Sequence, residues 1–153
     1  ANCGGSVNMF ESMKLAGILH NPDEPTPEHW IRPDEVLKMA TLHGAKAAGL
    51  DQETGSLEVG KKADITVLNP KRSFSLNPLE QPLHQIIYGE SGNAVETVII
   101  EGKIVVDDGV ITTFDEKMVL DEVEKRVERL QARYLNTKGK VEEEAAFIRR
   151  AFL

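Results

Sequence analysis

The sequence predicts an α+β fold in which helices come first, a small antiparallel sheet follows and a long helix ends the chain. Three observations lead to this prediction. Before residue 50, apolar residues recur every three or four positions, which is the helical period. Between residues 55 and 112, the pattern changes to short apolar runs separated by glycine turns. From residue 115 the helical spacing returns. The chain has 153 residues, of which 41% are hydrophobic, so it can bury a core.

The first helix is expected to start at Asn8 and to run out near His20. The Asn8 side chain can accept hydrogen bonds from backbone N–H groups of the first turn, and Glu11 stands three residues further on, as in a capping box. Three prolines fall in the stretch 22–27, and proline cannot continue a helix. A loop is therefore expected there.

The second helix is expected to begin at Pro33 and to end at a C-cap on Gly49. Proline is favoured at the first helical position, and Asp34 and Glu35 suit the positive end of the helix dipole. Glycine can take the left-handed conformation that ends many helices. The expected buried face consists of Val36, Leu37, Ala40, Gly44, Ala47 and Ala48.

A strand is expected around residues 65–68, followed by a β-meander. Its strands are 97–100 and 103–106, then a short third one, with turns at Glu101-Gly102 and Asp108-Gly109. The runs VII and IVV are continuously apolar instead of alternating, which is typical of strands covered on both faces. This chain offers few strands that could provide such a cover.

Asp115 is expected to cap the third helix. A narrow apolar stripe follows on its surface, formed by Leu120, Val123, Val127, Leu130 and Tyr134. Gly139 interrupts this pattern, and the residues after it predict a separate, short amphipathic helix.

Composition restricts the classes of partner. The net charge of −7 argues against nucleic acid, which requires a basic face. Cys3 is the single cysteine, so an internal disulfide cannot form and a reducing cytoplasm is expected. No apolar run approaches the ~20 residues of a membrane span, so no membrane partner is expected.

The residues alone do not form a complete active site. His20, His29, His43 and His84 lack metal-ligand spacing, and His43 is interpreted as a packing or capping residue. Cys3 has no visible base nearby, as a nucleophilic cysteine would need. No catalytic residue and no metal ligand is therefore assigned within this chain.

Five stretches occur together in the order and spacing of a known family. They are NMFESMKLAGIL (8–19), EVLKMATLHGAKAAGL (35–50), GSLEVGKKADITVLN (55–69), PLHQIIYGES (82–91) and VETVIIEGKIVVDDG (95–109). Together they resemble the C-terminal third of the metal-dependent amidohydrolases. The most similar branch contains triazine chlorohydrolases, guanine and cytosine deaminases, and S-adenosylhomocysteine deaminases.

The resemblance implies a specific architecture, a (β/α)8 barrel joined to a β-sandwich that is built from both chain ends. Residues 1–54 would supply the loop after the eighth barrel strand and the last barrel helices. Residues 55–114 would supply sandwich strands of this composite domain. Residues 115–153 would form a C-terminal helix and an amphipathic tail.

The resemblance also implies a function for a longer parent protein. Such a parent would hydrolyse a non-peptide C–N bond or a C–Cl bond of a small heterocycle, with Zn²⁺ or Fe²⁺ as cofactor. The metal-binding aspartate would lie shortly before Ala1, and the other ligands further upstream. The chain is therefore expected to be a fragment that holds no cofactor and is inactive alone. It would be an engineered domain, a proteolytic product or a short reading frame.

In this scheme the first residues line the substrate pocket, because active sites of such barrels lie in the loops after the strands. Asn2 and Cys3 are the expected substrate contacts, and Ser6 is the third residue of this wall, with a mainly structural role. The alternative is a non-catalytic accessory or oligomerisation module. Under either hypothesis, strands left without their cover predict a homo-oligomer.

Overall fold

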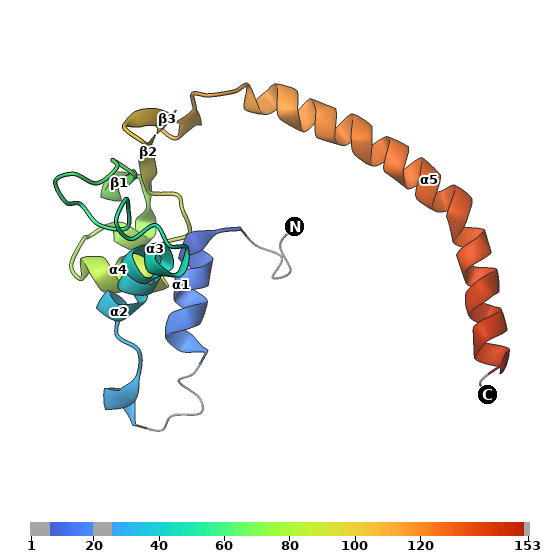
Figure 1. Ribbon diagram of the computed structural model, residues 1–153, viewed down its shortest axis with the longest axis horizontal. Helices are drawn as coiled ribbons and strands as arrows, with labels where there is room; N and C mark the ends of the chain where they lie inside the picture. Colours follow the sequence, from blue (N-terminus) through green and yellow to red (C-terminus); the bar gives the residue numbers. More distant parts are fainter. Residues whose placement is uncertain (1–6, 20–25, 152–153) are drawn as a thin grey trace. The chain divides into compact units, whose positions relative to one another are not determined.

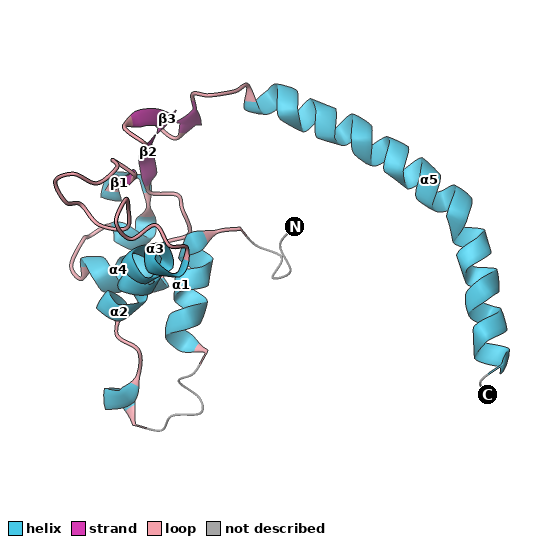
Figure 2. Ribbon diagram, viewed as in Figure 1, coloured by secondary structure: helices cyan, strands magenta, loops and turns pink. Residues whose placement is uncertain are grey.

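The computed structural model describes residues 7–19 and 26–151, and it divides the chain into two compact units, Ala1–Thr113 and Phe114–Leu153. The first unit combines helices with an antiparallel sheet (Figure 1). The second unit is a single long helix (Figure 2). The mixed α and β content that the sequence predicts is confirmed.

Helix α1 spans Met9–Ile18 and starts where the sequence predicts. The Asn8 Oδ1 atom accepts hydrogen bonds from the backbone N–H groups of Phe10 (2.9 Å) and Glu11 (3.4 Å). The described part of the proline-rich stretch contains one short 3₁₀ turn, η2, over Pro27–His29.

The predicted second helix forms, but it is not uniformly α-helical. It consists of α2 (Pro33–Lys38), a π-helical turn η3 (Met39–His43) and α3 (Gly44–Ala47). It ends as expected at Gly49, whose φ is +72°. The N–H of Gly49 bonds to the carbonyl of Lys46, and the N–H of Leu50 bonds to that of Ala45, which is the Schellman pattern.

The π-turn corrects the predicted buried face. Val36 is buried and Leu37 and Ala40 are half-buried, as expected, but Gly44, Ala47 and Ala48 are exposed. Ala45 is buried in their place. A π-turn closes its hydrogen bonds over five residues instead of four, so every position after it is rotated by about one residue relative to an α-helical pattern.

Helix α4, Pro82–Tyr88, lies in the long connection between the first two strands, together with the 3₁₀ turns η4 (Pro70–Arg72) and η5 (Phe74–Leu76). The sequence pattern did not predict this helix. Helix α4 contacts both α1 and α2, and the core lies among these three helices. Its central side chains are Met13, Val36 and Ile87.

The described strands form one antiparallel sheet in the order β1-β2-β3-β4. They are β1 (Ile65–Leu68), β2 (Val95–Ile100), β3 (Lys103–Asp107) and β4 (Val110–Ile111). The predicted meander is thus confirmed. At the β2–β3 turn both Glu101 (φ +50°) and Gly102 (φ +76°) have positive φ, as a type I′ turn requires.

The sheet is poorly covered. Within the described strands no side chain is fully buried, and Ile100 and Ile104 are 50% and 52% exposed. Val67 is also exposed, whereas Ile65, Ile99 and Val105 are half-buried. The cover on both faces that the continuous apolar runs predict is therefore not provided by the described residues of this chain.

Helix α5 spans Glu116–Ala151. Asp115 caps it as predicted, since its Oδ1 accepts the N–H of Met118 at 3.0 Å. The expected break at Gly139 is wrong: the helix continues through it, because an interior glycine costs only about 1 kcal/mol relative to alanine. The stripe from Leu120 to Tyr134 is exposed. None of the helices in the described part of the chain is long and apolar enough to cross a membrane.

Candidate functional site

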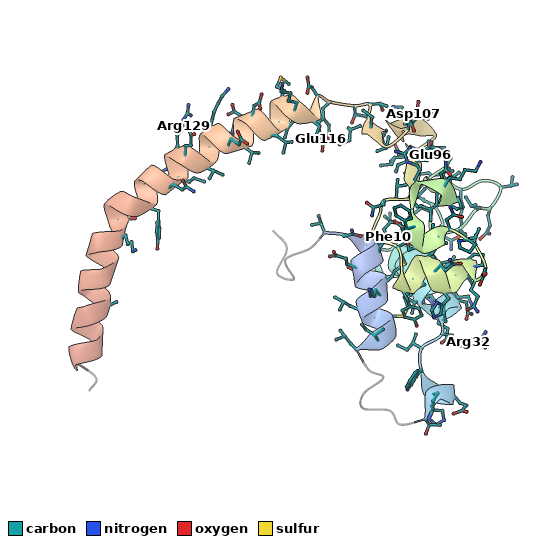
Figure 3. The ribbon with its side chains drawn as sticks, turned by 180° about the vertical axis from the view of Figure 1, so that it is seen from behind. Phe10, Arg32, Glu96, Asp107, Glu116 and Arg129 are labelled. Carbon is teal, nitrogen blue, oxygen red and sulfur yellow. The ribbon has the colours of Figure 1, made fainter. Side chains whose placement is uncertain are left out.

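The three residues expected to contact substrate, Asn2, Cys3 and Ser6, lie outside the described residues. The described residues begin at Val7, directly after this segment. Val7 and Asn8 lead directly into α1, and Phe10 on its first turn packs against the core (Figure 3). The described structure that follows this segment in the sequence is the start of α1, which is contacted by the segment 90–94.

Asn8 joins two segments that are 83 residues apart in sequence. Its Oδ1 atom caps α1, while its Nδ2 atom donates to the carbonyl oxygen of Ser91 at 2.7 Å. The same amide thereby satisfies backbone donors of the helix and a backbone acceptor of the 90–94 turn. Gly92 lies beside this contact, since a Cβ added there would be 3.8 Å from the Cδ2 atom of Phe10.

Glu90 organises the turn that Asn8 contacts. Its side chain is almost fully buried, with the residue 3% exposed. The Oε1 atom accepts the N–H groups of Gly92 (2.7 Å) and Ala94 (3.0 Å), and Oε2 accepts the Ser75 hydroxyl (3.2 Å). Burial raises the pKa of this carboxyl, but hydrogen bonds from Ser73, Ala94 and Gly92 together outweigh it, so that the pKa is lowered. Glu90 is therefore a buried carboxylate at neutral pH.

Sequence reasoning did not identify Glu90. It follows the apolar run of α4 in the stretch QIIYGES, and nothing in that stretch distinguishes a buried carboxylate from a solvated one. A charged residue is rarely fully buried unless it is paired or hydrogen-bonded, and its partners here come from residues 73–75 and 92–94. The donors at residues 92–94 are local, but the serines at 73 and 75 approach Glu90 only in the folded chain, so its burial could not be predicted from the sequence.

A second polar cluster closes the loop between α3 and β1. The Nζ atom of Lys61 donates to the Asp51 carbonyl and to the Ser56 hydroxyl, each at 2.7 Å. Lys62 bridges Glu53 (2.6 Å) and Glu101 (3.0 Å).

Hydrogen bonds and charge within this cluster shift the pKa values of Lys62 and Asp64, among others. The carboxylates of Glu53 and Glu101 raise the pKa of Lys62. Asp64 accepts the Glu101 N–H (2.8 Å) and the Thr54 hydroxyl (3.0 Å), and these bonds lower its pKa. Because the partners are loop backbone and neighbouring side chains, the cluster ties the loop to the β2–β3 turn, which is a structural role.

The histidines lie in separate places. His29 is in η2, His43 ends the π-turn, and His84 lies in α4 with its ring 4.7 Å from the Tyr88 ring, centroid to centroid. His20 lies outside the described residues. Over residues 7–19 and 26–151, no three or more His, Cys, Asp or Glu side chains gather into a group that could hold a metal ion. The described residues therefore do not fit a metal centre.

An open hollow of about 650 Å³ lies between the helix of residues 33–47 and strand β1. Small residues such as Gly44 and Ala48 form its helical wall, and Gly55, Ile65 and Thr66 form the opposite wall. Ligand pockets combine an apolar lining with a few convergent polar groups. The lining is largely small and apolar, but Thr54, Ser56 and Asp64 also contribute polar groups to it.

The chain is similar to known proteins over most of its length. The sequence model of the amidohydrolase family matches residues 1–105. The chain is 36% identical over 128 residues to a 5′-deoxyadenosine deaminase of Methanosarcina barkeri, covering 84% of this chain and 29% of that protein. It is 33% identical over 137 residues to an S-triazine hydrolase of Gordonia rubripertincta, covering 87% and 28% respectively.

A solved structure has a similar fold. It is an adenosine deaminase of Xanthomonas campestris with bound zinc, with a TM-score of 0.76 and 27% identity, and the match covers 81% of this chain and 28% of that one. The chain thus spans less than a third of the length of each of these three proteins.

Proposed function

Because this chain belongs to the amidohydrolase family, we propose that it is the C-terminal portion of a hydrolase acting on a small heterocycle. The bond cleaved is a non-peptide C–N bond, as in a deaminase, or a C–Cl bond, as in a chlorohydrolase. One observation carries the proposal. Relatives named as a deaminase and a triazine hydrolase align with more than four-fifths of this chain, while the chain spans less than a third of either.

The proposed architecture follows the resemblance. Residues 1–54 contribute the loop after the last barrel strand and the terminal barrel helices, residues 55–114 contribute strands of the composite β-sandwich, and residues 115–153 form the C-terminal helix and tail. The exposed apolar residues of the sheet support this proposal, as does the hollow beside β1, because both leave room for polypeptide supplied by the longer protein.

In this proposal the segment 1–6 forms one wall of the substrate pocket. Asn2 and Cys3 contact the heterocycle, and Ser6 shapes the wall. Since the described residues do not fit a metal site, a zinc or iron ion would be held by the remainder of the longer protein. The adenosine deaminase of similar fold, which contains zinc, supports a metal-dependent parent. A cytoplasmic location is part of the same proposal.

The experiment compares the product of the complete gene with the 153-residue chain. Both are incubated with 5′-deoxyadenosine, S-adenosylhomocysteine, guanine and a chlorotriazine, and release of ammonia or chloride is measured. We expect turnover of at least one substrate by the longer protein and none by the chain. Failure of the zinc-loaded longer protein on all four substrates, or turnover by the chain alone, would contradict the proposal.

Substitutions in the longer protein test the pocket wall. Cys3→Ala and Asn2→Ala are expected to raise KM by about three- to tenfold, as loss of one or two polar contacts does. Ser6→Ala is the matched control, with a smaller expected effect. An unchanged KM in all three variants would show that these side chains do not contact the substrate.

The second candidate function is a non-catalytic accessory or oligomerisation module. The exposed apolar stripe on α5 favours it, since exposed stripes of this spacing commonly pack against another helix. The upstream reading frame distinguishes the two candidates. A barrel-encoding region with an HxH motif favours the hydrolase, and a start codon close to Ala1 favours the module.

A further inference from the structure

We propose that the apolar stripe of α5 docks against the same stripe of a second copy of this chain, with the two helices antiparallel. The stripe is formed by five exposed side chains, which are Leu120, Val123, Val127, Leu130 and Tyr134. The hydrolase activity proposed above is not needed for this pairing, which involves only residues 116–134 of α5.

The stripe is exposed and regularly spaced. Its five side chains are between 42% and 63% exposed. They follow one another at intervals of three and four residues, which is the spacing of the seam along which two helices pack in a coiled coil. At 1.5 Å per residue, residues 116–134 extend over about 28 Å. The stripe therefore fits a second helix that lies along it.

The stripe is self-complementary about Lys125. In an antiparallel pair centred on this residue, Leu120 of each copy lies opposite Leu130 of the other copy, and Val123 lies opposite Val127. Leucine thus meets leucine and valine meets valine, in four aliphatic layers. Packing of this kind, in which the side chains of one helix fit between those of the other, is what stabilises paired helices.

The charge of α5 changes sign at the same point. Residues 116–124 contain four acidic residues and one lysine, a net charge of −3, while residues 126–134 contain three arginines and one glutamate, a net charge of +2. Glu116 and Arg129, one from each segment, are labelled in Figure 3. An antiparallel pair places each acidic segment beside the basic segment of the other copy, whereas a parallel pair places like charges together.

Interactions within a single helix do not account for this distribution. The helix dipole acts within the first and last turns, but Arg129 and Arg133 lie well inside a helix that ends at Ala151. Like charges also stand four residues apart at Glu124 and Glu128 and at Arg129 and Arg133, which destabilises an isolated helix. A neighbouring segment of opposite charge would relieve both repulsions.

Disulfide trapping in the 153-residue chain tests the orientation. Leu120→Cys and Leu130→Cys are each combined with Cys3→Ser, so that every chain carries one thiol. With a mild oxidant, we expect little linked dimer from either variant alone and abundant linked dimer from their mixture, because residue 120 faces residue 130 of the other copy. Lys125→Cys, which lies off the stripe, is the control and should not form linked dimer.

The other occupants of the stripe give different results. Linked dimer from each variant alone would show a parallel pair, and equal linking in every sample, the control included, would show chance collision. A chain that sediments at 16.9 kDa at micromolar concentration and does not link on mixing would show that the second copy does not cover the stripe. Each of these three results would overturn the proposal.

Charge reversal tests the electrostatic part. Asp121→Lys with Glu124→Lys changes residues 116–124 to a net charge of +1, so that both segments are positive. Arg129→Glu with Arg133→Glu changes residues 126–134 to a net charge of −2, so that both are negative. At low salt, sedimentation should show each double variant alone to associate about tenfold more weakly than the unsubstituted chain.

An equimolar mixture of the two double variants should recover the association, because each copy then meets a segment of opposite charge. Recovery would also show that both variants keep a helix able to pair. Undiminished association of both double variants, or a mixture that associates no better than they do alone, would overturn the proposal.

Discussion

At the scale of single residues, Gly55 is a position where both backbone and packing require glycine. Its φ is +90°, and an added Cβ would lie 2.7 Å from the Cβ of Ala45 and 3.2 Å from the carbonyl oxygen of Thr41. Gly60 has a similar φ of +96° with open space around it. An alanine at Gly60 would therefore introduce backbone strain alone, whereas an alanine at Gly55 would introduce both strain and a steric clash.

We expect Gly55→Ala to lower the free energy of unfolding by about 2–4 kcal/mol, which combines left-handed strain with overpacking. Gly60→Ala should lower it by only about 1 kcal/mol, from strain alone. Urea unfolding of both variants measures the difference. If both variants lost the same free energy of unfolding, Gly55 and Ala45 would be less closely packed than the structure indicates.

Glu90 predicts a pH dependence of stability. Its folded pKa lies below the unfolded value of about 4.3, so its contribution is present above that pH and is lost as the pH falls through the folded pKa. The melting temperature of the 153-residue chain should therefore exceed that of Glu90→Gln at pH 7. We expect this difference to shrink progressively below about pH 4.

Thermal unfolding monitored from pH 7 to pH 3 provides the measurement. Glu96→Gln, which leaves the buried carboxylate in place, should follow the acid dependence of the unsubstituted chain. A constant difference between Glu90→Gln and the unsubstituted chain across this range would mean that Glu90 does not titrate differently on folding.

At the scale of elements, Gly139 tests whether α5 is one helix. It lies within the continuous segment Glu116–Ala151. Because glycine lowers helix stability, Gly139→Ala should stabilise the helix by up to about 1 kcal/mol and increase the circular dichroism signal at 222 nm. If it ended a helix in the left-handed conformation, alanine would reduce that signal. Gly102→Ala, at a turn with φ of +76°, is the control that should destabilise the protein.

The helix of residues 33–47 shows why an element can be predicted while its buried face is not. The proline at its start and the glycine beyond its end act locally, so the boundaries are predictable. The π-turn at Met39–His43 has no comparable local determinant in the sequence. Because this turn rotates the residues of α3, it buries Ala45 and exposes Gly44 along the hollow beside β1.

At the scale of the whole molecule, exposed apolar surface predicts self-association. Ile100 and Ile104 on the sheet and Val127 and Leu130 on α5 are exposed, and contiguous apolar patches are uncommon on monomers. We expect light scattering at micromolar concentration to report a species larger than the 16.9 kDa chain. A monodisperse 16.9 kDa species that binds no hydrophobic dye would contradict this.

Paired substitutions locate the association surface. If α5 contributes, Val127→Asp should lower the scattering mass, while Lys125→Asp, two residues earlier and off the stripe, should leave it unchanged. Persistence of the larger species in Val127→Asp would assign association to the first unit, where the exposed residues of the sheet lie.

Local chemistry in the sequence was sufficient for the start of α1, the two hairpin turns and the cap of α5. In each case the determinant lies within a few residues of its effect, as with Asn8, Glu101-Gly102 and Asp115. The family was also predictable, because its stretches keep their order and spacing along the chain. The expected pocket residues came from that resemblance and remain a prediction.

Tertiary structure alone decided the helix α4, the burial of Ala45 and the burial of Glu90. Helix α4 is seven residues long, and so short a helix depends on packing, here against α1 and α2. The carboxylate of Glu90 is satisfied by N–H donors of its own turn and by Ser75, which comes from another segment. The contact between Asn8 and Ser91 joins residues that are 83 positions apart. No local pattern encodes such a contact, because its energy depends on where the fold brings the two segments together.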